Sequence, residues 1–191
     1  MKRLGDVRRA LAALLLVCSA AASAAEPPLT AGAVDLQRYQ GVWYELARLP
    51  MFFQRNCVQA EAHYALQADG RVRVTNRCRT DKGKWQEAHG EAVAQVEGQT
   101  DKLWVRFDNW FSRLLPNVTK GEYWVLYLDE DYRTALVGHP NRKYLWLLAR
   151  DPEVSAETRA LLLEQATLRG YDTRELIWRA ADEPAAPQPV N

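Results

Sequence analysis

The chain has 191 residues, of which 25 are Lys or Arg and 24 are Asp or Glu, so its formal charge is +1. Such a balance supplies no field strong enough to hold a polyanion, which argues against nucleic acid as a partner. The 48% apolar fraction excludes a disordered chain, and the length suits one domain with a single core.

The first 25 residues have the pattern of an export signal. Four basic residues among the first nine precede the apolar run 10–17, which is too short to span a bilayer. Ser23 and Ala25 occupy the −3 and −1 positions that a signal peptidase needs, so Glu26 would begin the mature protein. The sequence therefore predicts export to the periplasm. No apolar run after residue 25 is long enough to span a membrane.

The same segment allows a second interpretation, in which the chain is anchored by a lipid. Residues 15–18, Leu-Leu-Val-Cys, resemble a bacterial lipobox, and Cys18 would then carry the lipid. Val17 departs from the small residue usually found before that cysteine. The sequence thus leaves open a released protein and one anchored to the outer membrane.

Two cysteines, Cys57 and Cys78, remain after the signal and flank a predicted hairpin. Apolar residues alternate along 58–66 and again along 72–74, with a turn of the Asp-Gly type between them. Folding the hairpin about residues 67–69 places the two cysteines nearly opposite each other. We expect a disulfide worth about 2–4 kcal/mol in an oxidising compartment, the alternative being two buried free thiols.

Alternation of apolar and polar residues continues through most of the chain. On the first strand Trp43, Glu45 and Ala47 are expected to share one face, with Tyr44 and Leu46 on the other. Eight short strands with tight turns predict an all-β fold, an up-and-down antiparallel sheet closed into a barrel so that no edge is exposed. The predicted strands are 41–48, 58–66, 71–77, 84–96, 103–107, 123–128, 134–138 and 144–150.

One C-terminal helix is predicted between an N-cap at Ser155 and a stop at Gly170. Its apolar stripe, expected to pack outside the barrel over Tyr44 and Leu46, consists of Leu161, Leu162, Ala166 and Leu168. A short strand at 175–178 follows. The domain is expected to cover residues 26–181, and the proline-rich tail 182–191 is predicted to be disordered.

Inward side-chain volume decides whether an eight-stranded barrel is filled or holds one ligand. Small residues gather near 60–62 and 88–94, and the inward positions of the fourth strand are Ala88, Gly90, Ala92, Ala94 and Val96. This predicts an apolar cavity suited to a molecule with a long hydrocarbon part. The alternative is a solid barrel, in which large residues from facing strands occupy the space.

Three segments resemble the motifs of the lipocalins. Residues 35–50 contain Gly41-Val42-Trp43, which resembles the Gly-x-Trp motif of the first strand. The turn 128–132, Leu-Asp-Glu-Asp-Tyr, resembles the second motif but departs from its Thr-Asp-Tyr form, and 144–150 resembles the third, with its arginine. The segments 131–138 and 176–178 are most similar to those of bacterial lipocalins, in the branch that includes apolipoprotein D and the plant temperature-induced lipocalins. The resemblance implies a calycin barrel that binds a lipophile.

The resemblance also assigns structural roles. It implies that Trp43 plugs the closed end of the barrel and that Arg150 lies across its ring, where cation–π attraction and burial of the arginine stem combine. The other motif residues that it marks as structural are Gly41, Asp131 and Tyr132.

Strand parity predicts the ligand contacts at inward positions nearer the open end, although ordinary packing is the alternative at each. The candidates are Tyr64, Val74, Ala92, Phe107, Tyr144 and Trp146. A separate loop, 109–120, places four apolar residues between basic Arg113 and Lys120, which is typical either of a membrane-surface contact or lid or of a loop packed on its own barrel. Those four are Trp110, Phe111, Leu114 and Leu115.

Catalytic motifs are absent from the sequence: it has no Gly-x-Ser-x-Gly, no His-Glu-x-x-His, no phosphate loop and no Cys-x-x-Cys. His63, His89 and His139 lie on separate strands or turns, so no metal and no cofactor is expected. We therefore expect a non-enzymatic protein that holds a fatty acid or lysophospholipid for transport, storage or scavenging. The alternatives are an enzyme that acts on a bound lipophile through Glu45 or a tyrosine, and a filled barrel that acts as an interaction protein.

Overall fold

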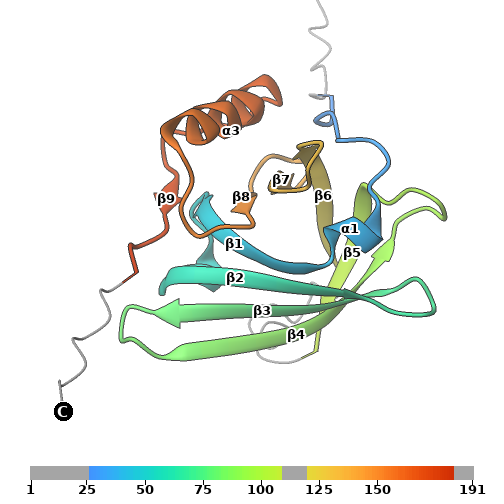
Figure 1. Ribbon diagram of the computed structural model, residues 1–191, viewed down its shortest axis with the longest axis horizontal. Helices are drawn as coiled ribbons and strands as arrows, with labels where there is room; N and C mark the ends of the chain where they lie inside the picture. The colour runs from blue at the N-terminus through green and yellow to red at the C-terminus, as the bar shows by residue number, and fades with distance from the viewer. Residues whose placement is uncertain (1–25, 109–119, 183–191) are drawn as a thin grey trace, which may run out of the picture.

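The computed structural model describes residues 26–108 and 120–182. Eight antiparallel strands form a closed up-and-down barrel, as predicted (Figure 1). β1 pairs with β2 on one side and with β8 on the other, which closes the sheet. The strands are β1 (Gly41–Arg48), β2 (Cys57–Leu66), β3 (Val72–Thr80), β4 (Trp85–Ala94), β5 (Lys102–Phe107), β6 (Gly121–Leu128), β7 (Thr134–Gly138) and β8 (Leu145–Ala149).

Two helical segments lie at the ends of the barrel wall, and a third lies outside it. The short helix α1 (Leu36–Tyr39) precedes β1, and the 3₁₀ turn η1 (Phe52–Gln54) lies between β1 and β2. α3 (Ala156–Leu168) packs outside the barrel, and β9 (Ile177–Trp178) pairs with the end of β1 (Figure 1). Among the described residues, no helix has both the length and the apolar character that crossing a membrane requires.

A bulge in β1 corrects one prediction. The pairing of β1 with β8 shifts register between Glu45 and Ala47. Trp43 faces the barrel interior, but Leu46 and Ala47 both belong to the core cluster outside it. The expectation that Ala47 shares a face with Trp43 was wrong, because an extra residue in a strand reverses the alternation beyond it.

The helix α3 begins and ends as predicted, but its buried face is narrower than the predicted stripe. The Ser155 hydroxyl accepts a hydrogen bond from the Thr158 amide at 3.2 Å, and Gly170 follows the helix with φ +79°. Leu162 and Ala166 are fully buried, whereas Leu161 is 39% and Leu168 is 69% exposed. Residues at i and i+4 share a face, and the two exposed leucines are turned away from it.

The predicted disulfide is present. Cys57 and Cys78 are bonded, with 5.5 Å between their Cα atoms, and they link β2 to β3. Cys78 lies opposite Ala60 rather than Cys57, because the hairpin turns about residue 69, with Leu66 paired to Val72, and not about residues 67–69 as expected. Val96, predicted on the inner face of the fourth strand, lies beyond the end of β4 and is 55% exposed.

Several predictions fall on residues that the structure does not describe. They concern the signal segment with Cys18, the tail beyond Asp182, and the loop that carries Trp110, Phe111, Leu114 and Leu115. Asp182 itself is described, and its carboxylate accepts hydrogen bonds from Gln59 and Arg179.

Candidate functional site

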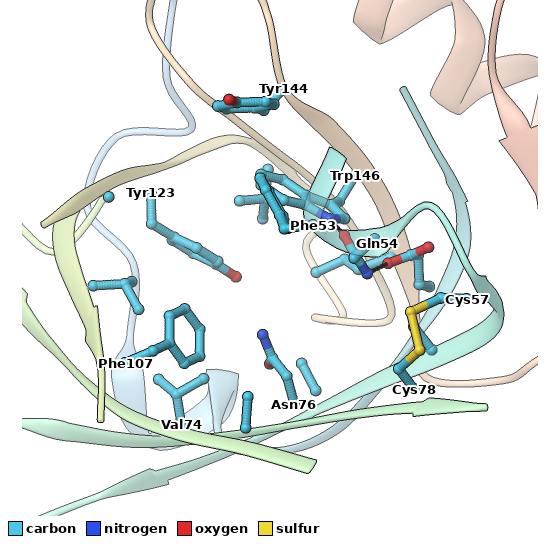
Figure 2. A pocket seen from close by; sticks show the side chains of 18 of the residues that line it. Phe53, Gln54, Cys57, Val74, Asn76, Cys78, Phe107, Tyr123, Tyr144 and Trp146 are labelled. Atoms are coloured by element: carbon cyan, nitrogen blue, oxygen red, sulfur yellow. Dashed lines mark hydrogen bonds between the residues drawn. A yellow bond between two sulfur atoms is a disulfide. The ribbon is translucent and has the colours of Figure 1, made fainter. Parts of the chain in front are cut away.

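The barrel encloses a cavity of about 430 Å³ toward the end opposite α1, and Figure 2 shows side chains that line it. This volume lies in the range of about 300–1,000 Å³ that is typical of small-molecule sites. Its lining comes from η1, from the barrel strands, and from the turn between β7 and β8. The barrel is therefore hollow, as the small inward residues predicted, and the solid interior is excluded.

A row of small side chains across three strands creates the space. Ala62 on β2 pairs with Asn76 on β3, and Asn76 pairs with Ala88 on β4. All three residues line the cavity. Gly90, one step further along β4, has another role, since a Cβ there would lie 2.4 Å from the carbonyl oxygen of Arg106.

Five of the six predicted ligand contacts line this cavity, namely Tyr64, Val74, Phe107, Tyr144 and Trp146. Ala92 does not. It lies at the closed end, beside a void of about 10 Å³ among Leu36, Tyr39, Val72 and Leu103. Strand parity placed Ala92 on the correct face of the sheet but did not indicate its depth, so the prediction that Ala92 is near the open end was wrong.

Sequence reasoning missed several lining residues, among them Phe53, Gln54, Asn76 and Tyr123. Asn76 has the same strand parity as Val72 and Val74, so alternation would have found it. Phe53 and Gln54 lie in the 3₁₀ turn η1, where no alternation exists to reveal them. The Phe53 ring packs edge-on against Tyr144, with 5.5 Å between centroids, and forms one side of the mouth.

A buried polar cluster joins η1 to the barrel wall. Arg48 Nη1 donates to Glu45 Oε1 at 3.0 Å, and Gln54 Nε2 donates to Glu45 Oε2 at 2.9 Å. Gln54 Oε1 in turn accepts from Trp146 Nε1 at 2.9 Å. Burial raises the pKa of Glu45 above its usual range, against the attraction of Arg48. Both carboxylate oxygens are thus engaged, and the cluster fixes η1 at the mouth.

Three tyrosine hydroxyls form a chain at the inner end of the cavity. The Tyr123 hydroxyl donates to that of Tyr64 at 2.9 Å, and the hydroxyls of Tyr39 and Tyr123 are also 2.9 Å apart. Burial raises the pKa of Tyr64 to about 12 and raises the pKa of Tyr39 and Tyr123 further above their usual value. The floor is therefore polar but uncharged at ordinary pH.

The mouth carries charged side chains of both signs. Arg77 pairs with Glu61, and His139 lies 3.2 Å from Glu122. Lys120 and Lys143 also line the cavity, and within the described ranges no carboxylate lies within 4.0 Å of either amine. The Lys120 amine lies 5.7 Å from the centroid of the Trp104 ring.

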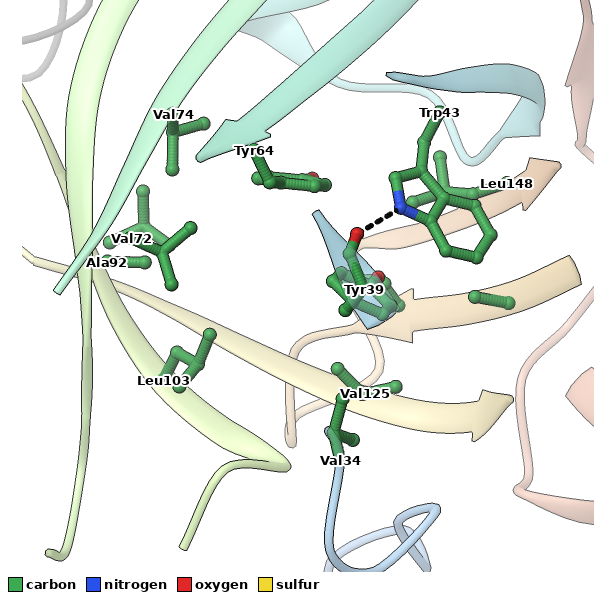
Figure 3. Packing of buried hydrophobic residues seen from close by; sticks show 13 residues of the cluster. Val34, Tyr39, Trp43, Tyr64, Val72, Val74, Ala92, Leu103, Val125 and Leu148 are labelled. Atoms are coloured by element: carbon green, nitrogen blue, oxygen red, sulfur yellow. Dashed lines mark hydrogen bonds between the residues drawn. The ribbon is translucent and has the colours of Figure 1, made fainter. Parts of the chain in front are cut away.

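The closed end is sealed by Trp43, which is fully buried (Figure 3). Trp43 Nε1 donates to the carbonyl oxygen of Tyr39 at 2.8 Å, and the Arg150 guanidinium lies 4.0 Å from the indole centroid. Arg150 also donates to the carbonyl oxygens of Val42 and Tyr132. The arrangement implied by the lipocalin resemblance is thus present.

The second motif departs from expectation at one residue. Asp131 is exposed, and the carboxylate that accepts from the backbone amides of Arg133 and Thr134 is that of Asp129. Tyr132 has φ +59°, and its hydroxyl accepts from the Asp35 amide at 2.9 Å. Gly41, with φ +95°, lies against Arg150, since a Cβ there would be 3.3 Å from Nη1.

A family model described as a lipocalin-like domain matches residues 34–181, which is most of the chain. The chain belongs to the lipocalin family. It is 37% identical over 182 residues to the outer membrane lipoprotein Blc of Escherichia coli, covering 93% of this chain and 97% of that protein. It is 40% identical over 146 residues to temperature-induced lipocalin-1 of Arabidopsis thaliana, covering 75% of this chain and 77% of that protein.

More distant lipocalins share the branch or the fold. Mouse apolipoprotein D is 29% identical over 149 residues, covering 74% of each chain. Insecticyanin from the tobacco hornworm superposes with a TM-score of 0.62 at 19% identity, covering 83% of this chain and 85% of that one. Lobster apocrustacyanin A1 gives a TM-score of 0.60 at 14% identity, covering 83% and 92%. At such identities the solved structures establish the barrel alone.

The lipocalin family and fold are generally those of non-enzymatic binding proteins. Within the part of the chain that the structure describes, no three His, Cys, Asp or Glu side chains converge as metal ligands would. His63 lies beside Glu61, and His89 beside Glu87, with much of each imidazole exposed.

Proposed function

We propose that this lipocalin binds a fatty acid or a lysophospholipid, with its acyl chain in the barrel and its acidic group at the mouth. The observation that supports this most directly is a largely apolar cavity of about 430 Å³ whose rim includes Lys120 and Lys143. Each buried methylene would contribute about 0.8 kcal/mol. The lysines would fix the direction in which the chain enters, because an acidic group is more stable beside them than at the uncharged floor.

Competition with a fluorescent fatty acid tests this proposal. Binding of a saturated fatty acid should weaken about tenfold when Lys120 and Lys143 are both changed to Ala, since two partly exposed ion pairs together contribute about 1–2 kcal/mol. Binding of the matched fatty alcohol should not change. Lys102→Ala is the control, because Lys102, at the start of β5, does not line the cavity.

Two results would contradict the proposal. A purified protein that takes up neither the fluorescent probe nor any acyl lipid would overturn binding itself. A double variant that loses the fatty acid and the alcohol equally would overturn the role of the two lysines. Native mass spectrometry of protein taken from its own envelope adds an independent measurement, in which one co-purifying lipid per chain is expected.

We further propose that the protein acts in the cell envelope in membrane-lipid transport, storage or scavenging, anchored to the outer membrane through Cys18. The Escherichia coli relative is named an outer membrane lipoprotein, and its match covers 93% of this chain, so at most about 13 of the 191 residues lie outside the match. The match therefore reaches Cys18. Mass analysis of the mature N-terminus should find an acylated Cys18, and a terminus at Glu26 would show release into the periplasm instead.

Catalysis through Glu45 is not part of this proposal. Both oxygens of its carboxylate accept hydrogen bonds, from Arg48 and Gln54, and the group is buried. A general acid or base needs an oxygen that can exchange a proton with the substrate, whereas both Glu45 oxygens are hydrogen-bonded to side chains of the protein. Its role in this proposal is to hold η1 in place.

A further inference from the structure

The inner end of the cavity has an unused hydrogen-bond donor. Each tyrosine hydroxyl carries one proton and two lone pairs. Tyr123 donates its proton to Tyr64, so the bond between Tyr39 and Tyr123 must use the proton of Tyr39. The proton of Tyr64 is then left over, and within the described ranges it has no hydrogen-bond acceptor. Tyr64 and Tyr123 both line the cavity, so this donor is within reach of a ligand.

Asn76 supplies a second polar group on the adjacent wall. Its side chain projects from β3 into the cavity with the amide nitrogen foremost (Figure 2). Its Oδ1 is buried and has no hydrogen-bond partner among the described residues. The neighbours across the sheet are Ala62 and Ala88, which have no polar side-chain atoms to offer. The amide therefore has hydrogen-bonding capacity that the protein leaves unused.

These groups make the deep part of the cavity unlike a hydrocarbon pocket. A saturated chain passing Asn76 and Tyr64 would remove both groups from water without replacing the hydrogen bonds. A carboxylate is equally unsuited, because the side chains at this level are uncharged or, at Glu45, acidic, whereas Lys120 and Lys143 lie at the mouth where β6 and β8 begin. The fitting group is uncharged and accepts hydrogen bonds.

We propose that the cavity selects acyl chains that carry an uncharged oxygen, a hydroxyl or a ketone, on the buried part of the chain. The oxygen accepts a hydrogen bond from the Tyr64 hydroxyl or the Asn76 amide, while the acidic group stays at the mouth. This inference rests on the proposed function, because the direction of entry is set by the two lysines there. It adds a specificity that the apolar lining alone does not provide.

Competition binding with a matched ligand set tests the inference. The set consists of octadecanoic acid, its isomers with one hydroxyl at successive positions along the chain, and the corresponding ketones. At least one hydroxy isomer should bind about tenfold tighter than the plain acid, the gain expected of one buried hydrogen bond. The ketone at that position should bind about as tightly, because the Tyr64 hydroxyl or the Asn76 amide nitrogen donates this hydrogen bond and the ligand oxygen only accepts it.

Two variants assign the preference to residues. Tyr64→Phe and Asn76→Leu remove the donors and keep similar side-chain volumes, so each should reduce the preference and the double variant should abolish it. The preference is measured in each variant as the ratio of its affinities for the hydroxy acid and for plain octadecanoic acid. Tyr127→Phe is the matched control, since it removes a hydroxyl from a side chain that does not line the cavity, and it should retain the preference. Thermal melting establishes that each variant is folded before its binding is compared.

The outcomes separate this inference from the proposed function. Equal binding of plain, hydroxy and oxo acids would overturn the inference and leave lipid binding intact. A preference that survives in the double variant, or a ketone that binds no better than the plain chain, would also overturn it. Failure of every acid to bind would overturn the proposed function as well.

Discussion

Trp43 is held at the closed end from two directions. Its indole nitrogen donates to the Tyr39 carbonyl, and the Arg150 guanidinium covers one face of the ring while donating to carbonyls of β1 and of the turn before β7. Two side chains therefore tie together α1, β1 and the end of β8. The seal at this end depends on an aromatic ring, because no smaller side chain fills the space and offers the arginine a face.

Trp43→Ala is expected to destabilise the protein by about 3–5 kcal/mol, the usual cost of emptying such a buried site. Urea unfolding followed by circular dichroism measures this loss. Trp85→Ala is the control: Trp85 is 43% exposed, with Arg77 over its ring, and its loss should cost less than about 1 kcal/mol. Full stability with loss of ligand in the Trp43 variant would instead make Trp43 a ligand contact.

Glu45 predicts a pH dependence of stability. Burial raises its pKa, so the folded chain holds this proton more tightly than the unfolded chain does. At a pH below the ordinary pKa of a carboxyl group, Glu45 is protonated in both the folded and the unfolded chain, so its titration does not change the stability. As the pH rises, the unfolded chain ionises first and stability falls until the raised pKa is passed.

Glu45→Gln removes this titration, so the free energy of unfolding of the variant should rise relative to that of the native protein as the pH increases above about 4. Urea titrations of both proteins across this range measure the difference. If the variant instead becomes less stable relative to the native protein as the pH rises, the attraction of Arg48 outweighs burial and lowers the pKa of Glu45.

Among the elements, strands were easier to predict than faces of helices. A strand in a barrel has one face inside and one outside, so alternation located β1 to β8 within a few residues. Alternation does not reveal bulges, which explains the error at Ala47. For α3 the caps at Ser155 and Gly170 were readable, but Leu161 and Leu168 are apolar residues on the exposed side. Apolar type alone does not specify burial.

Two adjacent leucines of α3 test which face packs on the barrel. Leu162→Ala should lower the free energy of unfolding by about 2–5 kcal/mol, because Leu162 is fully buried. Leu161→Ala should change it by less than about 0.5 kcal/mol, since Leu161 is 39% exposed. Thermal and urea unfolding compare the pair directly, and equal losses would mean that the helix packs by a different face.

The hollow interior depends on where small residues lie along the barrel. The sequence indicated that inward residues of β2 and β4 are small, but depth required the register between strands. Ala88 borders the large cavity, whereas Ala92 lies at the tightly packed end beside Val72 and Leu103. Phe53 and Gln54 could not be anticipated, because a 3₁₀ turn between strands gives no alternation that would point its side chains into the barrel.

The same substitution at Ala88 and at Ala92 tests whether the first lies beside a ligand cavity and the second in a packed core. Ala88→Leu should fill part of the cavity and weaken fatty acid binding at least about tenfold, with a change in stability below about 1 kcal/mol. Ala92→Leu should leave the mouth unchanged but cost about 1–3 kcal/mol, because the void beside it is too small for three added carbons. Binding and urea unfolding are measured on both. Normal binding by the Ala88→Leu variant would show that ligands do not enter this cavity.

The pairing of β1 with β8 sets an order for assembly. Every other neighbouring pair in the barrel joins strands consecutive along the chain, but Tyr44 pairs with Ala149, about a hundred residues later. Closing so long a loop is slow compared with forming local hairpins. We therefore expect an open sheet to form first, in which the edge of β1 stays unpaired until β8 is in place. The barrel cannot retain a ligand until β1 has paired with β8. Ligand binding therefore follows folding and does not occur during synthesis.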